Sequence, residues 1–427
     1  MRRRDDPAVW ASVLFAANFL FMRFSAVPNA NITASVPLVL GWVFLAWRRG
    51  LITVDGMRLR WWLAGAGLSA LLPLAQLWFV AGVDVSIGSW ALWVTLWLPT
   101  VFRFVDASKA TFVRACSGVG WIGLAISLLS LAFVGSQALG VPYRDYFADI
   151  VPQPFQVGFF ATTAPISWGS PIHKSNAWLA LEPSFLSFLL GVALIAAVIA
   201  RLKWWVPVVI LAGIFSSFAG SGLALLTVAV VILFLTGRAA ALARPLLGGV
   251  LLFAIASMTP LSSIVFGRVG ELNEGQSSTA LRATLPYQAL WPEFSHSLPG
   301  MLVGYGAGTS RRLIEGTSVL GLLVPNPARL IFDYGLIVGA VLLAMLVVAH
   351  LRTPVPALSL SILASFLLLQ AATQPMINAL VVVGSLWAPA AYRLPVRPAR
   401  GSNRPAASPS SDPGVVVERD PLGASTS

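Results

Sequence analysis

The chain has 427 residues, of which only 10% are charged and 57% are hydrophobic, and its mean hydropathy is +0.81. A soluble domain carries about 25% charged residues, so this composition excludes an ordinary water-soluble fold and indicates that lipid is the solvent. The formal net charge of +12 is dispersed along the chain, which argues against a nucleic-acid partner. The single cysteine, Cys116, excludes an intramolecular disulfide.

Apolar segments that are suitable for membrane helices recur along most of the chain. They predict an all-α, polytopic bundle of about twelve transmembrane spans: 8–24, 30–47, 61–80, 86–103, 114–134, 178–200, 204–218, 220–236, 246–265, 329–350, 356–373 and 376–392. The short pair 204–218 and 220–236 is either two spans with a tight turn or one broken hairpin. We expect one integral membrane domain, 1–393, followed by a disordered tail, 394–427, that is rich in Pro, Ser, Gly and Arg.

Arginine and lysine mark every second short connection, for example at 48–60, 103–114 and 201–203, whereas the alternate connections near 25–29 and 81–85 carry none. Because basic loops stay in the cytoplasm, both termini are expected there. The two long loops, 135–177 and 266–328, are then extracytoplasmic.

The two long loops differ in composition. The loop 135–177 contains five prolines and many aromatic residues, which favours an ordered or interfacial cap over a linker. In the loop 266–328, Ser277 and Ser278 predict the start of a short helix that runs to Ala289, with Pro286 as a kink. The glycines of the run 300–308 permit positive φ and close approach of the backbone to a ligand, or simply form a flexible turn.

The outer loops also hold the residues that are suited to chemistry. An extracytoplasmic reaction without ATP needs an activated substrate, and a lipid-linked diphosphate sugar is one. Its diphosphate leaving group needs arginines, and its acceptor hydroxyl needs a carboxylate or imidazole base. The outer face offers arginines, one carboxylate at the start of a predicted helix and one histidine: Arg268, Arg282, Arg311, Arg312, Glu182 and His296.

Other function classes lack support in the sequence. There is no Walker-type phosphate loop, no HExxH or Cys/His metal spacing and no GxSxG elbow, so no cofactor or metal is expected. Ionisable residues are almost absent from the middle of the predicted spans, which counts against an ion-coupled transporter.

Three features of the C-terminal half resemble the O-antigen ligase and polysaccharide polymerase superfamily of bacterial membrane glycosyltransferases. Leu181-Glu182-Pro183-Ser184 opens a span, as the Glu-Pro-Ser of such polymerases does. Arg282 precedes Ala289-Leu290-Trp291 and the glycines of the run 300–308, and Asn326 precedes Tyr334-Gly335-Leu336 and Gly339. The resemblance is strongest in 178–350 and implies a multi-pass protein of the bacterial inner (plasma) membrane.

The resemblance also implies roles for single residues. Arg282, Glu182 and His296 are the expected catalytic residues, and Arg268, Arg311, Arg312 and Asn326 are expected to bind the substrate. The donor is then a polyprenyl-diphosphate-linked glycan and the acceptor a glycan or lipid. Two departures stand out: Gly220-Ser221-Gly222 lacks the arginine of the family's Ser-Arg pair, and Pro325 replaces the histidine of its His-Asn pair.

Each of these residues also has a structural alternative. Arg282 can form an ion pair in its loop, Arg311 and Arg312 can bind lipid headgroups, and His296 can be a solvated loop residue. Glu182 can favour a helix dipole, and Asp333 can pair with Arg329 four residues earlier. For the whole chain, the alternatives are a transporter or flippase of lipid-linked cargo and a non-catalytic subunit of envelope assembly.

Overall fold

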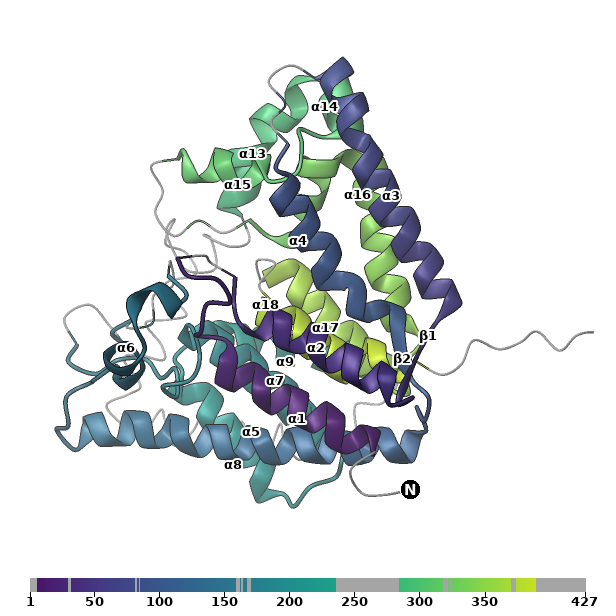
Figure 1. Ribbon diagram of the computed structural model, residues 1–427. Coiled ribbons are helices and arrows are strands. Elements are labelled where there is room, and N and C mark those ends of the chain that lie inside the picture. Colours follow the sequence, from purple (N-terminus) through teal and green to yellow (C-terminus); the bar gives the residue numbers. More distant parts are fainter. Residues whose placement is uncertain are drawn as a thin grey trace, which may run out of the picture. The chain divides into compact units, whose positions relative to one another are not determined.

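The computed structural model describes residues 6–29, 32–80, 83, 85–158, 162, 164–166, 170–235, 284–317, 322, 324–369 and 374–388. Within these residues the chain is mostly helical, with fifteen α-helices and a single two-stranded sheet (Figure 1). They all belong to one unit, Met1–Ala390. The predicted span 246–265, the predicted tail 394–427 and the candidates Arg268 and Arg282 lie outside the described residues.

The elements of the first half of the chain are α1 (Pro7–Phe21), α2 (Ser35–Arg48), β1 (Ile52–Val54), α3 (Gly56–Phe79), α4 (Ile87–Trp97), β2 (Phe102–Phe104), α5 (Lys109–Ala138) and α6 (Tyr146–Ile150). The later helices are α7 (Pro183–Ile199), α8 (Trp205–Ser216), α9 (Gly220–Leu235), α13 (Leu285–His296), α14 (Leu298–Val303), α15 (Thr309–Glu315), α16 (Asn326–Leu351), α17 (Pro356–Leu369) and α18 (Gln374–Val383). The strands β1 and β2 pair antiparallel, with Thr53 opposite Arg103.

Each of the other eleven predicted spans overlaps one of these helices, but the helices differ in length. Three are long and apolar enough to cross a membrane: α3, α5 and α16. The others are shorter; α8 has 12 residues and is therefore about 18 Å long, against a hydrocarbon core of about 30 Å. The structure thus establishes a mostly helical fold with three helices that are compatible with membrane spans.

Helix α3 shows how such a helix meets its surroundings. Its outer residues include large apolar side chains that remain exposed, and Trp78 is 85% exposed. Of the 18 consecutive residues that make up its most apolar stretch, only 22% are buried. A soluble protein rarely exposes an apolar face of this kind, whereas hydrocarbon solvates it.

Small residues let α5, α7 and α8 pack closely, and α5 runs beside α1, α7 and α8 (Figure 1). A Cβ added to Gly123 of α5 would lie 2.3 Å from the Cβ of Ala193 in α7, and one added to Gly213 of α8 would lie 2.6 Å from Ser127. Helices in lipid associate through such close contacts because burial of apolar surface drives them little there.

Arg58 ties together the end of the unit at which β1 and β2 lie. Although the basic pattern predicts Arg58 in a cytoplasmic connection, the residue lies in the first turn of α3 and is only 4% exposed. Its guanidinium donates to the carbonyl oxygens of Thr100 (3.3 Å), Phe102 (3.4 Å), Ala349 (2.8 Å) and Ser385. Buried carbonyls need such partners, so Arg58 joins α3 to α16 and to the segments on both sides.

The loop 135–177 is held to the end of α1 by a buried ion pair. Arg23 follows α1, and its guanidinium donates to both carboxylate oxygens of Asp145 (2.9 and 2.6 Å) and to the carbonyl of Trp178 (3.0 Å). The backbone of Val157 also donates to the Arg23 carbonyl. The described residues of this loop thus contact the end of α1 through side chains and backbone, and the ordered or interfacial cap stays a prediction. Arg23 also corrects the expectation that the connection between α1 and α2 carries no basic residue. The predicted span 8–24 includes Arg23, whereas α1 already ends at Phe21.

We expect Arg58→Met to destabilise the protein strongly. The substitution leaves several buried carbonyls without a donor, which costs about 2–5 kcal/mol. Thermal unfolding of the detergent-solubilised protein measures the effect. Arg60→Met is the matched control, because Arg60 is exposed in the same turn of α3; equal unfolding temperatures for both variants would contradict the role of Arg58.

Asp145→Asn should change how stability depends on pH. Burial of the Asp145 carboxyl opposes its ionisation, but the hydrogen bonds and charge of Arg23 outweigh this and hold the pKa of Asp145 below its ordinary value. The pair therefore stabilises the fold fully above the ordinary Asp pKa of about 3.9, and this contribution is lost as the pH falls through the lowered pKa. At neutral pH the variant should lose about 3 kcal/mol.

Unfolding temperatures between about pH 7 and pH 3 test this, and the gap between wild type and Asp145→Asn should shrink on the acid side. Asp149→Asn serves as control, because the Asp149 side chain is 46% exposed in its pair with Arg144. A gap that stays constant across the whole range would refute the linkage.

Candidate functional site

Helix α16 is broken at Gly335, where φ is 70° and ψ is 173°. This backbone conformation is accessible almost only to glycine. A Cβ at Gly335 would also lie 2.2 Å from the carbonyl oxygen of Leu302 and 2.6 Å from the backbone nitrogen of Gly304. The break therefore lets another backbone segment approach α16 directly.

That segment is the glycine run, which follows α14. Gly304, Gly306 and Gly308 all have positive φ, as their residue type permits. Tyr305 N–H donates to the Phe332 carbonyl (3.0 Å), and Gly306 N–H donates to the Asp333 carbonyl (3.1 Å). The close approach that the glycines allow is thus made to α16 of the protein itself, and the alternative of a merely flexible turn is wrong for these residues.

Gln76 of α3 completes this contact from the other side. Its amide nitrogen donates to the carbonyls of Val303 (2.7 Å) and Asp333 (3.0 Å). Gln76 is 1% exposed in the apolar C-terminal part of α3. Sequence reasoning missed this residue, although a lone amide within an apolar run is a signal for a buried polar contact.

Asp333 fixes the position of α15. Its carboxylate accepts from the backbone N–H of Gly308 (3.0 Å) and of Ser310 (2.8 Å), at the start of that helix. Arg329 lies 3.7 Å away, which confirms the predicted pair. Since the carboxylate is 1% exposed, the charge is held by these three partners, and the direction of α15 is set by α16.

The candidates of the second outer loop lie on this assembly. Arg311 and Arg312 are exposed on α15, and the Arg311 guanidinium is 2.6 Å from the Glu315 carboxylate. His296 is exposed at the end of α13. Pro286 is in the first turn of α13, which begins at Leu285, and the predicted helix start at Ser277 and Ser278 lies outside the described residues. Proline fits a first helical turn because the N–H that it lacks has no helical partner there.

Glu182 and Asn326 belong to other helix starts. Glu182 precedes α7, as predicted, and its carboxylate accepts from the Ser184 hydroxyl (3.0 Å). Asn326 is 3% exposed at the start of α16, and its amide nitrogen contacts the Phe366 carbonyl of α17 (3.4 Å). The structure therefore distributes the described candidates over two groups: α13–α15 carry His296 and the arginines, and the starts of α7 and α16 carry Glu182 and Asn326.

Ser221 and Gly222, at which the resemblance predicts a Ser-Arg pair, lie at the start of α9. The Ser221 hydroxyl donates to the Ser184 carbonyl (2.6 Å), and Gly222 N–H donates to the Ser187 hydroxyl (3.0 Å). A Cβ at Gly222 would lie 2.3 Å from the Ser187 carbonyl oxygen. These residues thus pack α9 tightly onto α7 beside Glu182.

A cavity of about 170 Å³ adjoins the glycine run. It is bounded by α3, the start of α4 and α16, and its lining includes Ser69, Gln76, Trp90, Ala307 and Tyr334. The Trp90 indole N–H donates to the Ser69 hydroxyl (3.0 Å), and Ser86 N–H donates to the Ala307 carbonyl (3.0 Å). The cavity is mostly apolar, and α15 with its two arginines begins two residues after Ala307.

The sequence matches no protein-family model, and no curated protein is similar enough to count as a relative.

Gly335→Ala should disrupt the docking of the glycine run. The methyl group would overlap the Leu302 carbonyl, and alanine disfavours the observed φ, so we expect a loss of about 2–4 kcal/mol in stability. Thermal unfolding measures the loss of stability, and limited proteolysis within 298–317 measures the disrupted docking of the glycine run. Gly67→Ala is the control, because a Cβ at Gly67 of α3 meets nothing within 4 Å; if Gly335→Ala behaves like Gly67→Ala, the break does not hold the loop.

Proposed function

We propose that the chain transfers or polymerises glycan from a polyprenyl-diphosphate-linked donor to a glycan or lipid acceptor on the extracytoplasmic face of a bacterial plasma membrane. It would be an enzyme of the O-antigen ligase and polymerase type, acting in the synthesis of cell-envelope polysaccharide. The carrying observation is that α15, which bears the exposed Arg311 and Arg312, begins two residues after Ala307 of an apolar cavity, on a loop fixed by Asp333 and Gly335.

This arrangement suits a ligand with a charged head and an apolar tail. Guanidinium groups match phosphate oxygens, and the cavity beside Trp90 and Ala307 is lined mostly by apolar surface. A polyprenyl diphosphate has both parts. A rigid loop favours catalysis, because donors that are fixed before the reaction stabilise developing charge without reorganisation.

In the proposed reaction, the oxygen of the acceptor hydroxyl attacks the anomeric carbon of the donor. The bond between that carbon and the diphosphate oxygen breaks, and polyprenyl diphosphate leaves with the electron pair. Arg282, Arg311 and Arg312 would stabilise the leaving group, with Arg268 and Asn326 binding substrate. The acceptor proton would pass to Glu182 or to His296. Glu182 is half-buried at the start of α7, and its carboxylate already accepts a hydrogen bond from the Ser184 hydroxyl.

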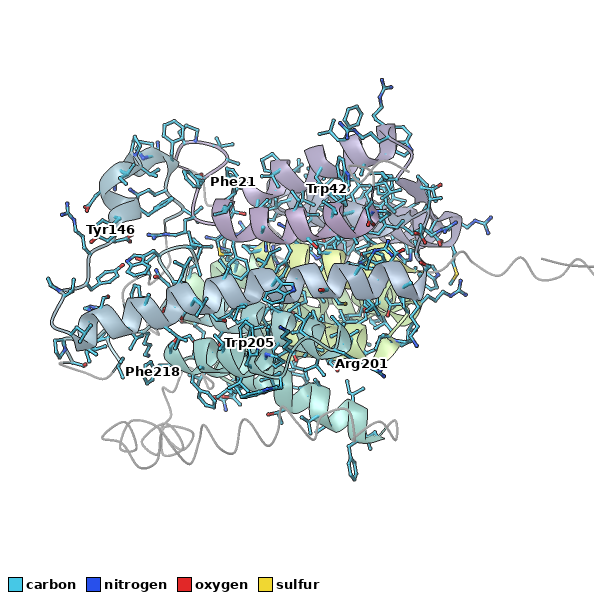
Figure 2. The ribbon with its side chains drawn as sticks, turned by 90° about the horizontal axis from the view of Figure 1, so that it is seen from below. Phe21, Trp42, Tyr146, Arg201, Trp205 and Phe218 are labelled. Carbon is cyan, nitrogen blue, oxygen red and sulfur yellow. The ribbon has the colours of Figure 1, made fainter. Side chains whose placement is uncertain are left out.

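Within this proposal the shorter helices also cross the bilayer, giving about twelve spans with both termini cytoplasmic. Arg201 and Tyr146 support this orientation, since Figure 2 shows them toward opposite ends of the unit. Arg201 belongs to a predicted cytoplasmic connection and Tyr146 to a predicted outer loop.

A transporter or flippase of lipid-linked cargo is the alternative. The ionisable residues that the structure buries in α3 and α16 argue against ion coupling, because they are engaged in structural hydrogen bonds. Arg58 holds carbonyls, Asp333 caps α15, and His350 contacts the Leu346 carbonyl (2.7 Å). A non-catalytic assembly subunit remains the other alternative that the experiment must separate.

The test uses the full-length protein in liposomes that contain a polyprenyl-diphosphate-linked oligosaccharide and an acceptor glycan. We expect release of polyprenyl diphosphate together with an extended acceptor. Glu182→Gln should lower the rate about 10²–10³-fold if the carboxylate is the base. Arg282→Ala and the double variant Arg311→Ala/Arg312→Ala should each lower it about 10²-fold.

Arg60→Ala is the control, because it removes an exposed arginine of α3 outside the proposed site. Movement of intact donor across the bilayer without its cleavage would favour the transporter. Cells that lack the protein but show an unchanged pool of lipid-linked oligosaccharide would contradict the transferase.

A further inference from the structure

Three arginines gather at the end of the unit where β1 and β2 lie. Arg58 is buried in the first turn of α3, Arg103 lies on β2, and Arg352 directly follows α16. The Arg58 guanidinium donates to the carbonyl of Phe102, the residue before Arg103. It also donates to the carbonyl of Ala349, three residues before Arg352. One side chain therefore joins the two backbone segments that carry the other two arginines.

The positive charge of these three residues exceeds the negative charge that faces it. Arg103 and Arg352 are close enough for their charges to repel that of Arg58. Among the described residues, Asp55 is the one carboxylate that attracts it. The Asp55 side chain is 6% exposed and already accepts from the backbone N–H of Met57 and of Arg58 at the start of α3. Three guanidinium groups thus share a single carboxylate.

Arg103 and Arg352 can still donate hydrogen bonds. The Arg103 guanidinium lies 3.7 Å from the Asp55 carboxylate, which is longer than a hydrogen bond. The described part of the chain offers neither Arg103 nor Arg352 a hydrogen-bond acceptor for its side chain. Arg352 is exposed, and the Arg103 side chain is 19% exposed. A ligand can therefore reach both, whereas Arg58 is buried and already donates to backbone carbonyls.

The three arginines lie where we expect the chain to meet phospholipid headgroups. They all belong to connections that the basic pattern predicts to be cytoplasmic. Figure 1 shows α3 running from the side of β1 and β2 toward α14. Large apolar side chains remain exposed along α3 close to its start, including Leu63 and Leu68. An arginine pair beside such a helix fits a ligand that has an anionic head and an apolar tail.

We propose that Arg103 and Arg352 bind the phosphate of an anionic phospholipid whose acyl chains lie along α3. Guanidinium groups match phosphate oxygens in geometry and charge, and basic pockets between membrane helices on the cytoplasmic side suit anionic headgroups. The phosphate would compensate the positive charge that Asp55 leaves unpaired. Because Arg103 is mostly shielded from water, salt screens this attraction less than at a fully exposed residue. The site does not depend on glycan transfer.

The experiment measures lipid binding to the full-length, detergent-solubilised protein by native mass spectrometry. The probes are phosphatidylglycerol, phosphatidylcholine and inorganic phosphate; the choline group of phosphatidylcholine neutralises its phosphate. We expect phosphatidylglycerol to bind at least about fivefold more tightly than phosphatidylcholine. Arg352→Gln should weaken binding of phosphatidylglycerol about fivefold, and Arg103→Gln/Arg352→Gln about 20-fold. Binding of phosphatidylcholine should change little.

Arg201→Gln/Lys203→Gln is the matched control. It removes the same number of charges from the same predicted face, at the exposed connection between α7 and α8, and should weaken binding less than about twofold if the site is specific. Equal weakening by both double variants would reduce the attraction to diffuse surface charge and overturn the proposal. Equal affinity for the two lipids overturns it too. Displacement of phosphatidylglycerol by equimolar inorganic phosphate would identify a soluble anion as the ligand instead of a lipid.

Thermal unfolding tests the site in a variant that should keep the fold. Arg352 is exposed and forms no ion pair with a described residue, so Arg352→Gln should unfold at the wild-type temperature without added lipid. A ligand that binds only the folded protein raises its unfolding temperature. Phosphatidylglycerol should therefore raise this temperature more in wild type than in Arg352→Gln. Equal shifts in the two proteins contradict the site.

Discussion

The break of α16 at Gly335 is the constraint on which the assembly of α14, α15 and the glycine run depends. A continuous helix would use the carbonyls of Phe332 and Asp333 in its own ladder, whereas the break offers both to the glycine run. Gln76 of α3 then binds Asp333 from the opposite side. As a result, one set of backbone and side-chain hydrogen bonds joins α3, α14, α15 and α16, and the Asp333 carboxylate of α16 fixes the start of α15.

Arg58 plays the corresponding part where β1 and β2 lie. In lipid, each unpaired backbone group costs several kcal/mol, and the segments around Thr100 and Ser385 are not regular α-helix. The fork of a guanidinium has enough donors for their carbonyls and for that of Ala349. The same rule holds at both places. Irregular backbone beside apolar helices is tolerated where a buried side chain donates hydrogen bonds to its carbonyl oxygens.

The helices could be predicted from the sequence far better than these junctions. Apolar length and proline position are local, so the starts of α7 and α16 agree with prediction within a few residues. The partner of the glycine run lies about thirty residues further on, and nothing in the spacing indicates that Gly304 meets Gly335. Gln76 and Arg58 carry a local signal, a polar residue in an apolar segment, but the signal does not name the carbonyls they bind. For the site, the sequence indicates which residue types the loops carry, and only the structure assigns Arg311 and Arg312 to α15 and Glu182 to the start of α7.

The exposure of each ion pair decides which arginines are available to a ligand. Arg23 and Asp145 are 5% and 13% exposed, so parting them would leave a buried charge uncompensated at a cost of about 3–5 kcal/mol. Arg311 and Glu315 are 57% and 44% exposed at i,i+4 spacing, where such a pair contributes about 0.3–0.5 kcal/mol. Exchanging Glu315 for another anion therefore disturbs the protein far less than exchanging Asp145.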